Sequence, residues 1–426
     1  MSLLLYTNVI VHWIRRLLTA QATPQDLPHS RSVLLHGISS PDTVSKLLDK
    51  HPVGPLQSFS YHPENTRVFL KFYEPSTAAK FFSSVRKAKP QLDVRIRRGK
   101  QRPLEADVVA AIGCRGASRC IAIDPAPEGE TEDSLGEDLA QFGAVEKVDF
   151  KMRYARVHFC DVRFALRAVE QLAPKEGEEG AKVYFTPERN DDVFIQKQSA
   201  VHGPDSTPNE PSRKVLLSNL QEPVVLRLIA WLVRGTLPDK EAVLLSMKRK
   251  FKTRDIYLDF LRIEDAARFT ENFNSQAPKL LPQLEGAKAI HITQVHPVPY
   301  DYNSVARAVS LGASRQLSIR RIKGCKKEDA PGIRDDFGQF GHVARVFVDE
   351  ANNMAYIEYA DIMDAMGAIE QIHARTKRRD PSLKRYAGAH ISFVKPNPSI
   401  NPLYPVVIPQ HFHTNDAEAK LATDAE

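Results

Sequence analysis

The sequence predicts an α+β protein built from four tandem βαββαβ modules that are arranged as two pairs. Residues 314–397 show the hydrophobic periodicity of strand, helix, strand, strand, helix and strand, in that order. The same order recurs three times earlier in the 426 residues. Short motifs of the first module recur in the third, and motifs of the second recur in the fourth. The unit of repetition is therefore a pair of modules.

The first module spans residues 31–98. Its two helices are expected to open at Asp42 and Ser76, residue types that cap helix N-termini. The last predicted strand alternates apolar and basic residues, which is typical of a strand with one buried face. The predicted strands are 31–38, 57–61, 67–72 and 92–97.

The second and third modules span residues 117–190 and 212–296. In the second, a predicted helix ends at Gly143, because glycine often terminates helices. Its helices are predicted at 135–142 and 162–172 and its strands at 120–123, 145–150, 154–159 and 182–185. In the third, the helices are predicted around Ile229 and at 264–273, and the strands at 213–220, 243–247, 255–260 and 289–293.

The fourth module, residues 314–397, shows the order of elements most clearly. A helix ends at Gly341, and a turn cluster of Asp, Glu and Asn at 349–353 separates two strands. A second helix opens at Asp361 and carries its apolar residues on one face. The strands are predicted at Gln316–Arg320, Val343–Val348, Met354–Tyr359 and His390–Val394.

The segments outside the modules differ from them in composition. We expect a flexible leader at 1–30, a polar linker at 191–211 and a disordered tail at 398–426. Inside each pair the connection is instead apolar, at Val108–Ile112 and at Val305–Val309. We expect each of these runs to form a short helix.

The repeated motifs establish the pairing. Gly-Ala-Ser-Arg at 116–119 recurs at 312–315, just before the second and fourth modules. Gln-Phe-Gly at 141–143 recurs at 339–341, and Ala-Val-Glu-Gln-Leu at 168–172 recurs with two changes at 368–372. Ser-Arg-Ser-Val-Leu-Leu at 30–35 recurs with one change at 212–217. Module one therefore pairs with three, and module two with four.

The third strand of module four carries an octamer, Asn352–Tyr359, that points to a family. Its match to the pattern K/R-G-F/Y-G/A-F-V-x-F/Y is good at positions four, five, six and eight, where residues are identical or similar, and poor at positions one, two and three. Together with the βαββαβ order, which is the ferredoxin-like arrangement, the octamer resembles the RNA-recognition motif (RRM). The resemblance implies four tandem RRM domains.

The layout also resembles one group of such proteins. Four modules with Gly-Ala-Ser-Arg before the second and fourth are similar to a fungal family, that of the negative regulator of sexual differentiation and its multicopy-suppressor relatives. The resemblance covers residues 31–397 and implies a cytoplasmic, post-transcriptional mRNA-binding protein. The family's first strands carry Val-Tyr-Leu-Gly-Asn-Leu or close variants, and here the tyrosine is replaced by Leu34, Ala122, Leu216 and Ser318. We therefore interpret the chain as a diverged member.

The third strands supply candidate RNA contacts, because bases stack on sheet aromatics in RRMs. Period-two alternation directs octamer positions three and five away from the helices. These positions hold Arg67 and Phe69, Tyr154 and Arg156, Asp255 and Tyr257, and Met354 and Tyr356. An aromatic in a strand is also ordinary β propensity, and a sheet covered by a protein partner is the main alternative.

Basic residues lie where phosphates would pass the sheets. The predicted contacts are Arg95 and Arg97 at the end of module one, Lys248, Arg249 and Lys250 in a hairpin loop of module three, and Arg320 and Arg321 after the first strand of module four. Phe393 in the last strand of module four completes the predicted set. A basic run is often only a solvated face. Module two is acidic at 128–138 and is expected to contribute least.

Composition narrows the function. A net charge of +7 and a pI near 9.1 favour a polyanionic partner. The four cysteines have no C-x-x-C spacing, so we expect reduced thiols. The sequence has no P-loop, H-E-x-x-H, G-x-S-x-G or zinc-type Cys/His pattern. We therefore predict no enzyme activity, no catalytic residues, no metal site and no cofactor.

The predicted function is binding of single-stranded RNA, in particular mRNA, as a post-transcriptional regulator. The alternative is a protein-interaction scaffold of degenerate RRMs with little RNA affinity, in which the degenerate modules bind protein partners. No membrane association is expected, because the apolar run at 3–14 is too short to span a bilayer. The expected location is the cytoplasm, with the nucleus as an alternative and a mitochondrial presequence in residues 1–23 as a minority alternative.

Overall fold

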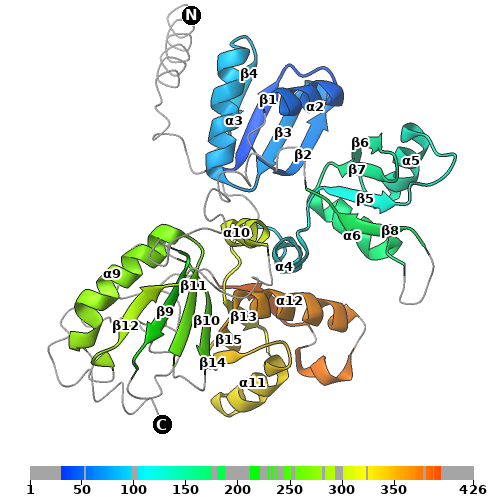
Figure 1. The fold of residues 1–426 in the computed structure, drawn as a ribbon. Helices are drawn as coiled ribbons and strands as arrows, with labels where there is room; N and C mark the ends of the chain where they lie inside the picture. The colour runs from blue at the N-terminus through cyan, green and yellow to red at the C-terminus, as the bar shows by residue number, and fades with distance from the viewer. Residues whose placement is uncertain are drawn as a thin grey trace, which may run out of the picture. The chain divides into compact units, whose positions relative to one another are not determined.

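In the computed structural model the described residues form four antiparallel sheets of four strands each (Figure 1). Within each module the strands lie in the spatial order 2-3-1-4, which βαββαβ connectivity produces. The predicted fold class is therefore confirmed. The structure describes residues 30–394 except for 52–53, 98–102, 175–179, 188–211, 221–228, 230–231, 234–236, 238–242, 251–254, 281–283, 293–300, 323–324, 378–379 and 387.

The first two modules have the predicted elements in the predicted order. Module one contains β1 (Ser32–His36), α2 (Pro41–Lys50), β2 (Leu56–His62), β3 (Arg67–Phe72), α3 (Pro75–Ala88) and β4 (Asp93–Ile96). Module two contains β5 (Cys120–Asp124), α5 (Glu132–Leu139), β6 (Val145–Phe150), β7 (Ala155–Phe159), α6 (Val162–Leu172) and β8 (Lys182–Phe185).

The last two modules repeat this order. Module three contains β9 (Lys214–Ser218), β10 (Leu244–Lys250), β11 (Asp255–Phe260), α9 (Ile263–Leu280) and β12 (Lys288–His291), and its first helix is described only at Ile229, Leu232 and Val233. Module four contains β13 (Gln316–Arg320), α11 (Ala330–Gly338), β14 (Val343–Asp349), β15 (Met354–Tyr359), α12 (Ile362–Lys377) and β16 (His390–Phe393).

Alternation along the first strand of each module decides which sheet face is buried. In β1, Val33 and Leu35 are fully buried, whereas Leu34 between them is half-buried on the other face. Val44 of α2 and Phe81 of α3 belong to the same hydrophobic core. The two helices therefore cover one face, and the opposite face, here called the outer face, carries the residues that the helices do not cover.

The Phe-Gly turns before β6 and β14 require glycine for steric reasons. Gly143 has φ +143° and Gly341 has φ +155°, where side chains are disfavoured. A Cβ at Gly143 would overlap the Phe164 ring, and one at Gly341 would overlap the Asp364 carboxylate. Because these neighbours lie at the start of α6 and α12, glycine lets the turn approach the second helix of its module closely.

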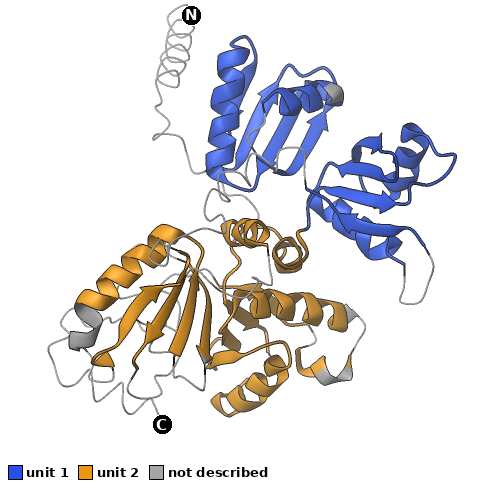
Figure 2. Cartoon of the chain, viewed as in Figure 1, with its two compact units in different colours: residues 1–102, 117–200 blue, residues 103–116, 201–426 orange. Residues whose placement is uncertain are grey.

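The chain divides into two compact units (Figure 2). Unit 1 contains residues 1–102 and 117–200, and unit 2 contains residues 103–116 and 201–426. The helices expected inside the pairs are present as α4 (Ala106–Arg115) and α10 (Tyr302–Ser310). α4 belongs to unit 2, where it packs against α10 and α12, although its neighbours along the chain, β4 and β5, belong to unit 1.

Three predicted segments fall outside the described residues. They are the leader up to residue 29, the 191–211 linker and the 398–426 tail. Among the helices that the structure describes, none has the length and apolar character needed to cross a membrane.

Candidate nucleic-acid interface

The strand register aligns one row of side chains across the centre of each outer face, here called the central row. In order from the second strand across the sheet to the fourth strand, the row of module one comprises Ser60, Phe69, Leu34 and Arg95. The rows of the other modules are Asp149, Arg156, Ala122 and Tyr184 in module two, Lys248, Tyr257, Leu216 and Ile290 in module three, and Phe347, Tyr356, Ser318 and Ser392 in module four. Octamer position five therefore occupies the centre of each sheet.

In module one the structure brings the predicted residues together. The Arg97 guanidinium lies 5.2 Å from the centroid of the half-buried Phe69 ring, and His62 meets that ring edge-on at 5.4 Å. Arg67 is exposed. Arg95 is also exposed but makes a two-hydrogen-bond pair with Asp93, at 2.9 and 2.7 Å. The Asp93 carboxylate raises the pKa of Arg95 through these hydrogen bonds and its charge.

In module two the aromatic in the central row is not the predicted one. Tyr154 precedes β7, and Arg156 takes the central position on that strand and donates to the Pro187 carbonyl. The row ends at Tyr184 of β8, whose side chain is 43% exposed. Sequence reasoning missed Tyr184 because it looked for stacking aromatics at the octamer positions of the third strands. The alternation of Lys182, Val183, Tyr184 and Phe185 could have shown it.

In module three only part of the predicted basic run faces outward. Lys248, Arg249 and Lys250 lie in β10, not in a hairpin loop, because the strand is longer than predicted. Lys248 shares the outer face with the half-buried Tyr257. Arg249 is in register with the fully buried Ile256, so it lies on the helix-covered face. The side chain of Lys250 is outside the described residues. Ile290, at 45% exposure, ends the row.

In module four Tyr356 has a neighbouring aromatic. Its ring lies 6.2 Å from that of Phe347, and both are half-buried. Burial raises the pKa of the Tyr356 phenol, and the Asp349 carboxylate adds to the rise. Arg320, at the end of β13, and Arg321, just after it, are exposed. The prediction that Phe393 contacts RNA is wrong. Its register partner Leu317 is fully buried, so both residues face the helices.

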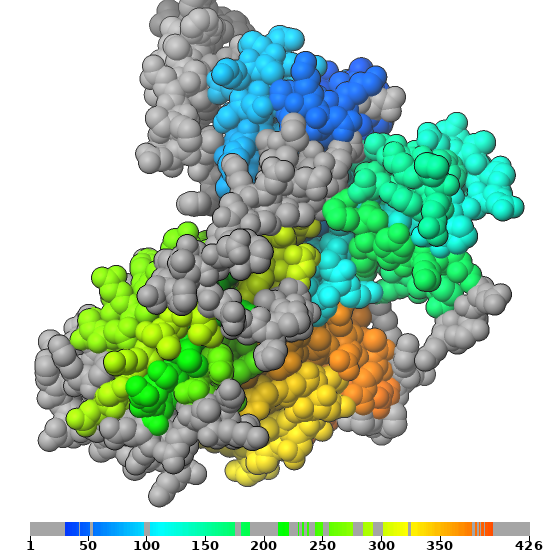
Figure 3. Space-filling view, in the orientation of Figure 1, coloured from blue at the N-terminus to red at the C-terminus, as the bar shows by residue number. Residues whose placement is uncertain are grey.

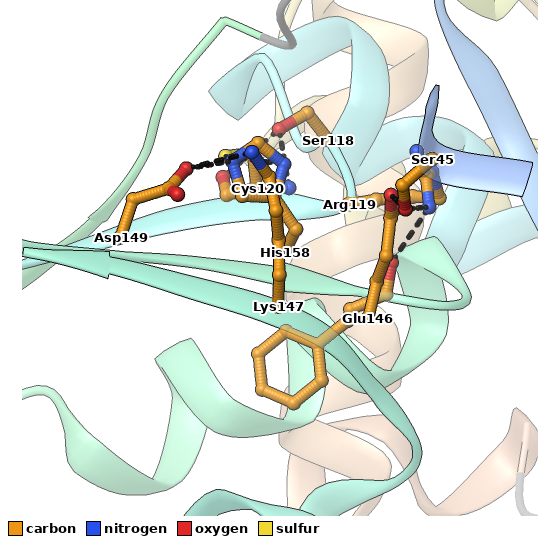
Figure 4. A network of polar contacts seen from close by, with 9 residues as sticks. Ser45, Ser118, Arg119, Cys120, Glu146, Lys147, Asp149 and His158 are labelled. Carbon is orange, nitrogen blue, oxygen red and sulfur yellow. Dashed lines mark hydrogen bonds and ion pairs between the residues drawn. The ribbon is translucent and has the colours of Figure 1, made fainter. Parts of the chain in front are cut away.

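The Gly-Ala-Ser-Arg motif builds a buried contact inside unit 1 (Figure 4). Arg119, at 1% exposure, donates to Glu146 at 3.1 Å and to the Phe159 carbonyl at 2.8 Å. Its guanidinium also lies 5.6 Å from the centroid of the Phe59 ring of module one. Ser45 of α2 donates to the same Glu146 carboxylate at 2.6 Å. The network therefore joins module one to module two.

Unit 2 repeats this contact. Arg315 donates to Glu358 at 3.2 Å, to the Tyr359 carbonyl at 2.8 Å and, across modules, to the Leu244 carbonyl at 3.0 Å. The Lys248 ammonium pairs with Asp361 of module four at 2.9 Å, so part of the predicted phosphate-binding run is engaged within the protein. We call the two contacts, centred on Arg119 and Arg315, the arginine junctions.

Backbone pairing reinforces each junction. The Phe59 amide donates to the Cys160 carbonyl at 2.8 Å, and the Met247 amide donates to the Ala360 carbonyl at the same distance. Both donors lie on the edge strand of the first module of a pair, and isolated bridges beside them join Ser58 to Asp161 and Ser246 to Asp361. These edges are therefore partly covered by the second module.

The serine of each Gly-Ala-Ser-Arg motif joins the first and last strands of its module. Ser118 donates to the carbonyls of Cys120 and Thr186, at 2.9 and 2.7 Å, which ties the start of β5 to the residue after β8. Ser314 makes the equivalent bonds to Gln316 and Val394, at 3.0 and 2.7 Å. The sequence showed that the motif recurs, but only the fold shows what it contacts.

Cys120, His158 and Asp149 have the residue types of a nucleophilic triad (Figure 4). The Cys120 sulfur lies 3.5 and 3.6 Å from the two nitrogens of His158, and His158 Nε2 lies 3.4 Å from Asp149. Burial alone would raise the pKa of Asp149, but the hydrogen bond and charge of Lys147 outweigh burial and lower it. Cys120 is fully buried, so no substrate reaches its sulfur, and we assign the cluster to packing of the sheet.

The topology and the outer-face rows define the class: the described residues form four RNA-recognition-motif folds. No family model matches the chain. The chain is 25% identical over 406 residues to "RNA-binding protein MRN1" of Saccharomyces cerevisiae, an alignment that covers 82% of this chain and 64% of that protein. It is 23% identical over 167 residues to "Meiotically up-regulated gene 24 protein" of Schizosaccharomyces pombe, covering 37% and 25%. The chain is thus similar to two fungal proteins and spans less than two thirds of the length of each.

Solved structures with similar folds include the three N-terminal RNA-binding domains of the yeast splicing factor Prp24, at 17% identity and a TM-score of 0.15, covering 59% of this chain and 91% of that one. RNA-recognition domains 1 and 2 of Sex-lethal from Drosophila melanogaster align at 12% identity and a TM-score of 0.20, covering 40% and 98%. The fold assignment rests on the strand order of this chain.

Proposed function

We propose that the chain binds single-stranded RNA on its outer faces and acts as a post-transcriptional regulator of mRNA. The observation that carries the proposal is the half-buried aromatic at the centre of three outer faces: Phe69, Tyr257 and Tyr356. Such rings offer a face for base stacking. The name of the relative MRN1, an RNA-binding protein, supports the same function.

The charge distribution supports phosphate contacts mainly in modules one and four. Arg67 and Arg97 are exposed around Phe69, and Arg320 and Arg321 are exposed near Tyr356. In module three, by contrast, Lys248 is paired and Arg249 lies on the helix-covered face. Phosphate contacts weaken with salt because they release counterions, whereas stacking depends little on salt. The two kinds of contact can therefore be measured separately.

The test is the affinity of the full chain for a pool of short random single-stranded RNAs at several salt concentrations. We expect Tyr257→Ala with Tyr356→Ala to weaken binding ten-fold or more, on the order of 1.4 kcal/mol, with little change in the salt slope. Arg67→Ala with Arg97→Ala should instead flatten the slope. Lys80→Ala with Lys87→Ala is the matched control, because these exposed lysines lie on α3. If none of the outer-face variants changes the affinity for RNA, the proposal is refuted.

A scaffold role is the second candidate for modules two and four. Their central first-strand residues, Ala122 and Ser318, are 0% and 2% exposed, so no base can stack there. The corresponding Leu34 and Leu216 of modules one and three are half-buried. If modules two and four serve as scaffolds, variants of their outer faces will leave RNA affinity unchanged while variants of modules one and three lower it.

A further inference from the structure

The helix α4 lies in one unit while the chain on both sides of it lies in the other. Residues 103–116 belong to unit 2, whereas β4 before them and β5 after them belong to unit 1. In the space-filling view, α4 lies against α10 and α12 (Figure 3). We propose that α4 is a docking helix, and that the surface formed by α10 and α12 binds it to tie the first pair of modules to the second.

Burial of α4 is that of a core helix, not of a surface linker. The five consecutive residues Val108–Ile112 are all at least 95% buried, so the helix is covered around its whole circumference. The helix has only ten residues, fewer than the roughly 12–15 that an isolated helix needs for marginal stability in water. Segment 103–116 therefore gains its helical structure from docking.

Close packing makes the surface specific for this helix. Gly113 lies against Met366 of α12 and Ala308 of α10. A Cβ added there would overlap the Met366 sulfur and lie 3.1 Å from the Ala308 Cβ. A glycine at this crossing lets the three helices approach, and a large side chain would separate them. Gly367 of α12 provides a contrast, because a Cβ there meets no atom within 4 Å.

Two side-chain contacts, one at each end of α4, fix its direction along α12. Asp107 in its first turn lies 3.1 Å from His373 Nε2, and Arg115 at its end lies 2.9 Å from Glu370. Each charge also has the favourable sign for its end of the α4 dipole. The thiol of Cys114 is hydrogen-bonded to Glu370 as well, and burial is the main cause that raises its pKa to about 12. The partner of this surface is thus a short apolar helix with an acid at its start and a base at its end.

The test uses the full chain with a recognition sequence for a site-specific protease placed within residues 195–207. After complete cleavage, and without RNA, the two fragments should elute together from a size-exclusion column at the mass of the intact 47.9 kDa chain. Gly113→Leu should release two species of about half that mass each. Gly367→Leu is the matched control and should leave the fragments joined.

A charge exchange tests the same contact independently of Gly113→Leu, which could act by misfolding. Arg115→Glu should weaken the association of the cleaved fragments at least ten-fold, and adding Glu370→Arg should restore it. The proposal is overturned if the cleaved wild-type fragments separate, or if Gly113→Leu leaves them together. It is also overturned if the uncleaved chain is a dimer that Gly113→Leu converts to a monomer, because the helix would then dock on a second copy.

Discussion

Replacing Arg315 by Met should destabilise the junction between modules three and four more than any other part of the chain. The guanidinium is 8% exposed and donates to one carboxylate and two carbonyls. One of these acceptors, the Leu244 carbonyl, belongs to module three. Met fills similar space without donating, so the substitution leaves all three acceptors without this partner.

The magnitude follows from the buried carboxylate. Glu358 is 3% exposed, and removing one partner of a buried ion pair costs about 3–5 kcal/mol. Because each tenfold change corresponds to about 1.36 kcal/mol, opening of the affected strands should become roughly 10²–10⁴ times more frequent. Adding Glu358→Met removes the buried carboxylate that has lost Arg315, so the double variant should recover most of the loss.

Hydrogen exchange followed by mass spectrometry measures this opening strand by strand, which suits a multi-domain chain because one unfolding free energy does not describe such a chain well. Exchange should accelerate in peptides from β10 and β15 and stay unchanged throughout unit 1. Arg119→Met should give the converse pattern. Equal acceleration in all four modules, or none in β10, would refute our assignment of Arg315 to the junction.

Three further predictions concern single positions. Gly341→Ala should lower the free energy of unfolding by about 1–3 kcal/mol, because its backbone has a positive φ and the added Cβ would meet Asp364. Gly338→Ala lies in open space on α11 and should be neutral or stabilising, and thermal melts of both variants test this. Burial lowers the pKa of His291, so the unfolded state binds more protons, and module three should lose stability as pH falls through about 6.5 towards the folded pKa. Hydrogen exchange at several pH values should show this loss, and His291→Gln should remove it. If the variant keeps the same pH dependence, His291 is not its cause. Proteases should cut first within 191–211 and give denatured fragments of about 20–25 kDa. Earlier cutting near 99–116 or 297–313 would contradict the paired arrangement.

The fold was predictable because its signals are local. Period-two alternation marks strands such as 67–72, and glycine marks where helices stop. The helix starts expected at Asp42 and Ser76 were wrong by one residue each, because α2 begins at Pro41 and α3 at Pro75. The repeats then fixed the number of modules and their pairing, and the confirmed strand order follows from that sequence of elements. The octamer also located the central aromatics Phe69, Tyr257 and Tyr356 correctly, because alternation alone decides which face a residue occupies.

The errors arose where strand length or register mattered. Arg249 was predicted to lie in a hairpin loop and Phe393 to contact RNA, but the strand register places both residues on the helix-covered face. Tyr184 was missed because the fourth strand becomes the neighbour of the first only when the sheet forms. The sequence does not show which residues become neighbours when the strands pair.

By itself, the sequence determined the α+β modules, their repetition and the candidate stacking residues, since each depends on neighbours a few positions away. Only the tertiary structure decided that Arg119 and Arg315 are buried at the junctions, that Lys248 pairs with Asp361, and that α4 docks in unit 2. These contacts join residues far apart in the chain, and their energies come from desolvation and close packing, which exist only after the chain has folded.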